Sequence, residues 1–226
     1  MKRVLSLFVA AAVLAACNPA PQDLALCGGR AVRGLTVTVS TDTPAEFPGM
    51  SLRSVAFINQ SGSPVKVDAI ETSRIAVSGA DIWSLQPTSS EARKDWVLPV
   101  GKGFSQRNYL GMNDPDYGGG IPMVSLWTQD TNLSVGVAEP ALTLVSMPVS
   151  RKGGTATACI RQDFDEPVTL APGDTLVACR QFVMESKGDF FNPLREFAAY
   201  KQGSYSDLLP MHSALLDKEL TSEILD

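Results

Sequence analysis

Short stretches in which apolar and polar residues alternate dominate the chain from residue 35 to residue 184. A stretch such as "LTVTVS" (35–40) puts successive side chains on opposite faces, which is typical of a β-strand with one face in water. Turn-forming clusters such as "QSGS" (60–63) separate these stretches. About ten or eleven short strands with such turns predict an antiparallel sandwich of two large sheets stacked face to face. The stretches are 35–40, 51–59, 64–71, 74–79, 80–87, 121–128, 133–139, 141–150, 155–162, 167–171 and 174–184.

The pattern changes near the C-terminus. The segment "NPLREFAAYKQ" (192–202) has apolar residues at helical spacing, with Asn192 placed as the N-cap and Pro193 at the first helical position. Gly203 is placed to end this helix. A second helical stretch covers roughly residues 206 to 225. The sequence therefore predicts a mainly β fold with short C-terminal helices.

The N-terminus has the organisation of a bacterial export signal. Lys2 and Arg3 precede an uncharged apolar run, 4–16, which is too short for a membrane span. "LAAC" (14–17) resembles a lipobox, in which Cys17 is lipidated and becomes the new N-terminus; the alternative is an ordinary secretory signal with an incidental cysteine. Several acyl chains on Cys17 would anchor the protein stably in the bacterial cell envelope, on a periplasmic or surface face. We expect a signal peptide at 1–17, a tether and lead-in at 18–29, a sandwich domain at 30–190 and a helical tail at 191–226.

The charge of the chain argues against a nucleic-acid partner. The formal net charge is −5, and removal of Lys2 and Arg3 with the signal peptide leaves −5 − 2 = −7. An acidic surface without a basic run lacks the phosphate-binding charges that nucleic-acid proteins require.

Three cysteines remain once Cys17 is lipidated: Cys27, Cys159 and Cys179. In an oxidising compartment two of them can form a disulfide. We favour Cys159 with Cys179, because both fall in neighbouring strand-like stretches, and this pairing leaves Cys27 free. A metal site is not expected, since no CxxC spacing occurs and His212 is the only histidine.

One stretch, "DYGGGIPMVSLW" (116–127), raises the question of a ligand. Its three glycines allow close approach of a backbone or a flat ligand. Asp116 offers hydrogen-bond acceptors, and Tyr117 and Trp127 offer aromatic faces, a combination that binds sugars. The alternative is a tight hairpin corner with Trp127 buried between the sheets. The stretch "KDW" (94–96) poses the same choice, because Asp95 and Trp96 could line a sugar subsite or Trp96 could fill the sheet interface.

Three longer segments carry a resemblance to a known family. They are "SSEARKDWVLPV" (89–100), "GFSQRNYLGMNDPDYGGGIPMVSLWTQDTNLSVGVAEPALTLVSMPV" (103–149) and "LAPGDTLVACRQFVMESKGDFFNPLREFAAYKQ" (170–202). Together they resemble the N-terminal region of α-galactosidase-like glycoside hydrolases, the family 36 and melibiase group. The resemblance implies a β-supersandwich domain, which in that family precedes a catalytic (β/α)8 barrel.

The resemblance also sets expectations about activity. Family members carry a nucleophile and a general acid/base on the barrel, and retaining hydrolysis needs these carboxylates about 5 Å apart. A barrel needs about 200 residues or more, whereas the sequence ends 24 residues after the last matched segment. We therefore expect no catalytic residue, no cofactor and negligible hydrolysis by this chain alone.

Two functions remain open at this point. The chain could be the non-catalytic domain of a truncated or split α-galactosidase-like enzyme, docking on a separately encoded barrel. Alternatively, it could be a free-standing lipoprotein that binds an α-galactoside or related oligosaccharide at the cell surface.

Overall fold

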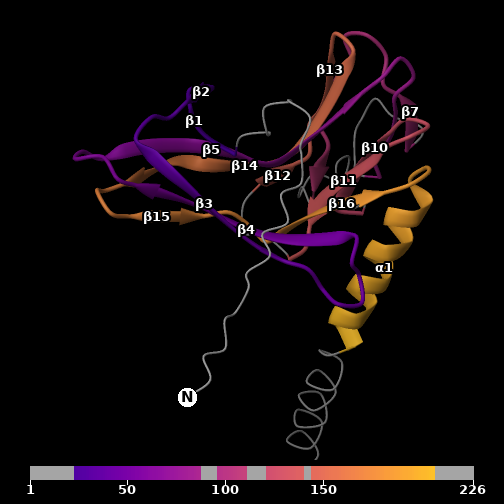
Figure 1. The fold of residues 1–226 in the computed structure, drawn as a ribbon. Helices are drawn as coiled ribbons and strands as arrows, with labels where there is room; N and C mark the ends of the chain where they lie inside the picture. Colours follow the sequence, from indigo (N-terminus) through magenta and orange to yellow (C-terminus); the bar gives the residue numbers. More distant parts are fainter. Residues whose placement is uncertain (1–22, 88–95, 111–120, 140–143, 207–226) are drawn as a thin grey trace, which may run out of the picture.

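The computed structural model describes residues 23–87, 96–110, 121–139 and 144–206. Two antiparallel sheets of eight strands each form the body, and one helix packs beside them (Figure 1). The prediction of a mainly β, two-sheet fold is confirmed. Sheet 1 contains β1 (Leu24–Cys27), β2 (Arg30–Ala31), β5 (Val65–Ser78), β8 (Ser105–Gln106), β9 (Tyr109–Leu110), β12 (Leu144–Ser146), β13 (Val149–Lys152) and β14 (Thr155–Leu170). Sheet 2 contains β3 (Leu35–Asp42), β4 (Met50–Asn59), β6 (Trp83–Leu85), β7 (Val97–Pro99), β10 (Met123–Trp127), β11 (Asn132–Val137), β15 (Thr175–Val177) and β16 (Gln181–Ser186).

Both sheets mix neighbours from distant parts of the sequence. Sheet 1 runs β2-β1-β5-β14-β12-β9, with β13 pairing β14 and β8. Sheet 2 runs β15-β4-β16-β11-β10-β6-β7, with β3 pairing β4. The sandwich begins at Leu24, because β1 pairs with β5. β1 therefore lies within the segment 18–29 that the sequence analysis assigns to a tether and lead-in, before the expected domain start at residue 30.

Four strands differ in extent from the stretches that the alternation pattern predicts. The stretches 64–71 and 74–79 form one strand, β5, which continues through Ser73 even though Ser73 has a positive φ of 49°. The stretches 155–162 and 167–171 likewise form one strand, β14, which absorbs two register shifts against β5. The stretch 174–184 does the reverse and is divided into β15 and β16.

The division between β15 and β16 has a visible cause in hydrogen bonding. The Cys179 N–H donates to Gln162 Oε1 at 2.7 Å instead of to a neighbouring strand. Two residues further on, the buried Gln181 Nε2 donates to Thr72 Oγ1 across the sheets. These side-chain bonds join the two sheets at the point where strand pairing is interrupted.

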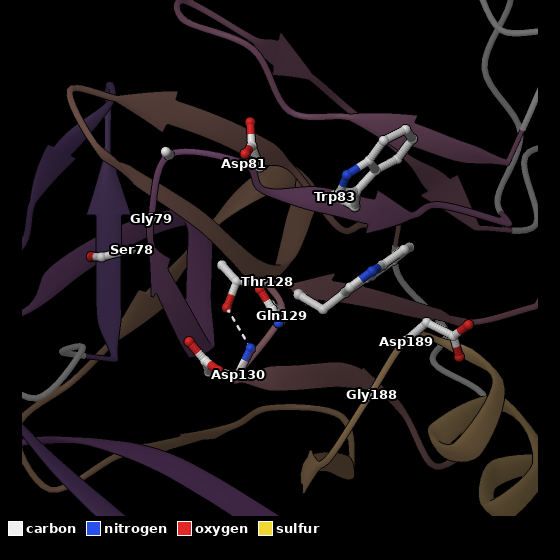
Figure 2. A pocket seen from close by; sticks show the side chains of 11 residues that line it. Ser78, Gly79, Asp81, Trp83, Thr128, Gln129, Asp130, Gly188 and Asp189 are labelled. Carbon is white, nitrogen blue, oxygen red and sulfur yellow. Dashed lines mark hydrogen bonds between the residues drawn. The ribbon is translucent and has the colours of Figure 1, made fainter.

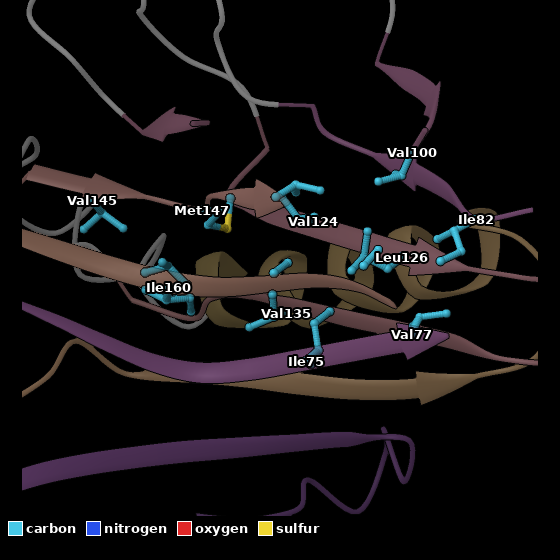
Figure 3. Close-up of a cluster of buried hydrophobic side chains, with 14 residues drawn as sticks. Ile75, Val77, Ile82, Val100, Val124, Leu126, Val135, Val145, Met147 and Ile160 are labelled. Atoms are coloured by element: carbon cyan, nitrogen blue, oxygen red, sulfur yellow. The ribbon is translucent and has the colours of Figure 1, made fainter. Parts of the chain in front are cut away.

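The main core lies between the sheets and follows the predicted alternation (Figure 3). Ile75 and Ile160 from sheet 1 face Val124 and Val135 from sheet 2. A second cluster, centred on Phe57, fills the other end of the same interface. Burial of these side chains, each about 1.5–3 kcal/mol, is the main stabilising contribution to the sandwich.

The outer face of sheet 2 is also apolar, and the helix α1 (Phe191–Ser206) covers part of it. The rings of Phe182 on β16 and Phe197 on α1 stack with their centroids 4.7 Å apart. Gly136 lies directly opposite Phe182 in the ladder. A Cβ on Gly136 would lie 2.4 Å from the Phe182 ring and from the Pro122 carbonyl oxygen. The ring therefore occupies the space that glycine leaves.

The boundaries of α1 differ from the sequence expectation. The helix begins at Phe191, and Asp189 Oδ1 accepts the Phe191 N–H at 3.0 Å. Asn192, the predicted cap, instead donates to the Lys187 carbonyl oxygen. The helix also continues past Gly203 to Ser206. The expected second helix, near 206–225, falls outside the described residues apart from Ser206 itself.

The outer face of sheet 1 has the opposite character, because a chain of ion pairs crosses it. Glu71 accepts from Arg74 and, at 3.0 Å, from Arg161. Arg161 and Arg107 both pair with Asp163, at 2.7 and 2.9 Å. The hydrogen bond to Asp163 raises the pKa of the Arg161 guanidinium, so that it stays charged. This face is therefore internally paired and polar.

The beginning of the described chain is fixed to both sheets. Asp23 Oδ2 pairs with Arg53 Nη2 of β4 at 3.0 Å, and Asp23 Oδ1 accepts the Ser73 N–H of β5 at 2.8 Å. Arg53 Nη1 also donates to Ser73 Oγ at 2.7 Å. This three-residue clamp satisfies the backbone of Ser73 in its left-handed conformation, which costs energy for a non-glycine residue.

Candidate functional site

A pocket of about 590 Å³ opens where the chain crosses from β5 of sheet 1 to β6 of sheet 2 (Figure 2). Its size lies within the range of small-molecule sites. Three segments form it: the β5–β6 turn, the β10–β11 turn and the loop between β16 and α1. The lining residues are Ser78, Gly79, Ala80, Asp81, Trp83, Trp127, Thr128, Gln129, Asp130, Gly188 and Asp189.

Two tryptophans supply the aromatic surface of the pocket. Trp83 on β6 lies directly opposite Trp127 on β10. Opposed residues of an antiparallel ladder project to the same face with Cβ atoms about 5 Å apart. Both therefore lie on the outer face of sheet 2, beyond the part that α1 covers. Trp127 is only 9% exposed, whereas Trp83 is 43% exposed.

An aromatic contact and two hydrogen bonds hold the buried Trp127 and the loop between β16 and α1 (residues 187–190, here the α1 loop) in place. The ring of Phe190 packs against Trp127 with centroids 5.5 Å apart. The buried Asn132, opposite Trp127 on β11, donates to the carbonyl oxygens of Gly188 at 3.2 Å and Asp189 at 2.6 Å. Asn132 therefore fixes the backbone that carries one wall of the pocket.

Carboxylates and neutral polar groups complete the lining. Figure 2 shows Asp81, Asp130 and Asp189 spread around the pocket, with Gln129 and Thr128 among them. Within the described chain, the carboxylates of Asp81 and Asp130 accept no hydrogen bond from the protein. Thr128 Oγ1 accepts the N–H groups of Asp130 and Thr131, both at 3.3 Å, so its own hydrogen is free to donate.

Arg151 on β13 holds the opposite wall by binding carbonyl groups. Its Nη2 donates to the carbonyl oxygens of Gly79 at 2.8 Å and Ala80 at 3.0 Å. Its Nη1 donates to the carbonyl oxygen of Val100 at 2.6 Å. The planar guanidinium can satisfy several acceptors at once, and here it orders the β5–β6 turn.

The predicted sugar-binding residues fall into three groups. Trp127 lines the pocket. Trp96 is 55% exposed but does not line it, and its predicted alternative role of filling the sheet interface is wrong. Asp95, Asp116 and Tyr117 lie outside the described residues.

Sequence reasoning missed the remaining pocket residues, Trp83 and the aspartates at 81, 130 and 189. A signal for Trp83 was present, because Ile82 and Trp83 are adjacent large apolar residues in a strand-like stretch. Successive strand residues face opposite ways, so one of the two had to lie outside the core. The three aspartates come from separate turns, and only the fold brings them together.

The predicted disulfide is not formed, since Cys27, Cys159 and Cys179 are free thiols. Cys159 belongs to β14 of sheet 1 and lies near the charges of Glu71 and Arg74. Cys179 follows β15 of sheet 2 and packs against the main core. Burial raises the pKa of the Cys159 thiol to about 12 and that of the Cys179 thiol to about 11, which keeps both protonated.

Residues 23–87, 96–110, 121–139 and 144–206 contain no group of three or more histidine, cysteine, aspartate or glutamate side chains that could hold a metal ion. In those same ranges no helix is long and apolar enough to cross a membrane.

Comparison with known proteins finds two similarities, one in the N-terminal sequence and one in the fold. Residues 1–18 match the prokaryotic membrane lipoprotein lipid attachment site, which includes Cys17. No curated protein matches the chain at a significant level. Among solved structures, the galactosidase domain of the α-galactosidase-sucrose kinase AgaSK aligns with a TM-score of 0.52 and 15% identity, over 69% of this chain and 23% of that one. The α-galactosidase from Lactobacillus brevis aligns with a TM-score of 0.53 and 14% identity, over 76% and 24%.

These alignments show the fold. The resemblance to α-galactosidases that the sequence carries is confirmed at that level. The chain spans about a quarter of the length of these solved structures.

Proposed function

We propose that this chain is a lipid-anchored, non-catalytic carbohydrate-binding module. The observation that supports this most directly is the partly exposed indole of Trp83 in a pocket that also presents Asp81, Asp130 and Asp189. A sugar ring has an apolar C–H face and an equatorial edge of hydroxyl groups. An aromatic ring covers the first, and carboxylates accept hydrogen bonds from the second.

The same pocket gives little support to catalysis. Glycoside hydrolysis needs a pair of carboxyl groups on either side of one bond, one of them acting as an acid. The three aspartates instead come from three different loops and surround the pocket (Figure 2). We assign them the role of accepting hydroxyl hydrogen bonds.

Calorimetry on the purified protein tests the proposal. We expect an uncharged galacto-oligosaccharide to bind the wild type, and Trp83→Ala to weaken binding at least about tenfold, because the stacking surface is lost. Trp96→Ala is the matched control, since Trp96 is also exposed but lies outside the pocket lining. The absence of binding to any neutral oligosaccharide, or equal loss in both variants, would overturn the proposal.

A second candidate function has its own supporting observation. The same fold makes up 23% and 24% of two α-galactosidase chains, where it is one part of a larger protein. The chain could correspondingly dock on a separately encoded catalytic barrel, and Phe191 at the start of α1 is 60% exposed and free to contribute to such a contact.

Isolation of the lipoprotein from its native membrane distinguishes this second candidate. Co-purification of an α-galactosidase activity that Phe191→Ser disrupts would support docking. An aryl α-galactoside should not be hydrolysed measurably by the pure chain under either candidate. Turnover by the pure chain would contradict both.

A further inference from the structure

We infer that the pocket selects uncharged sugars and rejects acidic ones. This inference rests on the proposed carbohydrate-binding function and adds the chemical class of the ligand. The structure supports it in two ways, through the balance of hydrogen-bond donors and acceptors and through the charge of the lining.

The first support is the excess of acceptors in the pocket. Each ionised aspartate carries two oxygens that only accept hydrogen bonds. Asp189 uses one of them for the Phe191 N–H, while Asp81 and Asp130 have none occupied within the described chain. The lining side chains able to donate are uncharged: the Thr128 hydroxyl, the Gln129 amide and the indole N–H groups of Trp83 and Trp127. The Ser78 hydroxyl is already paired with Thr155 Oγ1 at 2.8 Å. The ligand must therefore bring donors, and a polyhydroxylated ring does so.

The second support is the sign of the charge. None of the described lining residues is Lys, Arg or His, while three are Asp. Two basic residues of the described chain adjoin the lining, Arg151 through its hydrogen bonds and Lys187 through the sequence. The Arg151 guanidinium is engaged with the carbonyl oxygens of Val100, Gly79 and Ala80 behind the pocket wall. Lys187 is exposed and adjoins Gly188 without lining the pocket.

These charges make an acidic ligand unfavourable. A uronic acid would place a carboxylate beside three others, with no cation in the described lining to pair with it. Its carboxylate would also add hydrogen-bond acceptors to a pocket whose aspartates already need donors. Like charges held close together in a concave site repel strongly, and the site's concavity strengthens the effect.

The test compares two α-1,4-linked ligands of the same length that differ only at the exocyclic carbon C6 of each sugar, which is a hydroxymethyl group in one and a carboxylate in the other. Galacto-oligosaccharide and oligogalacturonic acid are titrated into the intact protein by calorimetry at low salt. We expect the neutral ligand to bind at least about tenfold more tightly. The difference should narrow as salt is added, because salt screens exposed charges.

Variants then assign the selectivity to the pocket. Asp81→Asn together with Asp130→Asn should reduce the preference several-fold, because both substitutions remove charge and add a donor. Both residues are exposed, so the fold should be retained, and Asp174→Asn provides a control carboxylate elsewhere on the surface. Equal or tighter binding of oligogalacturonic acid by the wild type overturns the inference and leaves the proposed function standing. Binding of neither ligand overturns the proposed function itself.

Discussion

Trp83 and Trp127 lie opposite each other on β6 and β10, yet one is 43% exposed and the other only 9%. Phe190 from the α1 loop covers Trp127 and leaves Trp83 open. The two residues therefore have different tasks, even though they share one face of one sheet. The buried indole supports the fold, and the open indole is available to a ligand.

Substituting each tryptophan by alanine should distinguish the structural role of Trp127 from the ligand-binding role proposed for Trp83. Trp127→Ala is expected to destabilise the protein by about 3–5 kcal/mol, because it leaves a cavity beneath Phe190. Trp83→Ala should cost about 1 kcal/mol or less, since much of its surface is already in water. Urea unfolding of both variants measures the difference. Equal destabilisation would show that Trp83 is also a structural residue.

Asn132 is expected to hold the pocket-lining backbone of Gly188 and Asp189 in position, although its own side chain is buried. Asn132→Ala removes the donors to the carbonyl oxygens of Gly188 and Asp189 and leaves them unsatisfied, at a cost of about 1–3 kcal/mol. It should also weaken sugar binding, since the α1 loop is no longer held. Asn59→Ala is the matched control: Asn59 is equally buried and binds the carbonyls of Ser63 and Leu170, far from the lining. That variant should lose stability and keep its affinity when folded.

Gly136 is expected to tolerate no side chain. Gly136→Ala places a Cβ against the Phe182 ring and the Pro122 carbonyl oxygen, so either the strands or the ring must move. We expect this movement to lower the free energy of unfolding by about 1–3 kcal/mol. A lowered midpoint in urea or heat would show this. Gly62→Ala, at a turn with open space around it, should leave the midpoint almost unchanged.

Alkaline pH should weaken the fold through its buried thiols. The pKa values of Cys159 and Cys179 are raised by burial from 9.0 to about 12 and about 11. Above pH 9 the unfolded chain loses thiol protons that the folded chain keeps. The free energy of unfolding should then fall by up to about 1.4 kcal/mol per pH unit for each thiol until the folded pKa is reached. Below pH 9 this contribution is complete and constant.

Chemical denaturation at pH 8 and pH 10.5 measures this effect. Cys159→Ala should reduce the pH dependence, whatever its effect on stability at pH 8. Cys27→Ala is the control, because Cys27 is less buried than Cys159. A disulfide between Cys159 and Cys179, detected as a loss of two hydrogens by mass spectrometry, would contradict the free thiols of the structure.

The two-sheet fold was predictable because alternation is a local property of the chain. On β10 the residues that join the main core, Val124 and Leu126, stand two positions apart, and alternation assigns them to one face before any contact is known. The boundaries were less predictable. Ser73 looks like a strand end in the sequence, but Asp23 and Arg53 stabilise its unusual backbone and the strand continues.

The site was mostly hidden from the sequence for a related reason. Trp127 was identified from its own neighbourhood, while its ladder partner Trp83 lies 44 positions earlier. Strand order sets that pairing, and alternation does not encode strand order. The predicted disulfide between Cys159 and Cys179 relied on their closeness in sequence, whereas the fold places Cys159 in β14 of sheet 1 and Cys179 between β15 and β16 of sheet 2.

The clamp at Asp23 has a mechanical consequence for a protein fastened to a membrane. Asp23 follows the lipid-attachment residue Cys17 by six positions, a reach of about 20 Å at full extension. A force that pulls on the N-terminal segment reaches the described domain at Asp23, whose carboxylate is bonded to both sheets. Because Arg53 belongs to sheet 2 and Ser73 to sheet 1, the bonds of Asp23 pass part of this force to each sheet. These bonds must break before the force can separate β1 from β5.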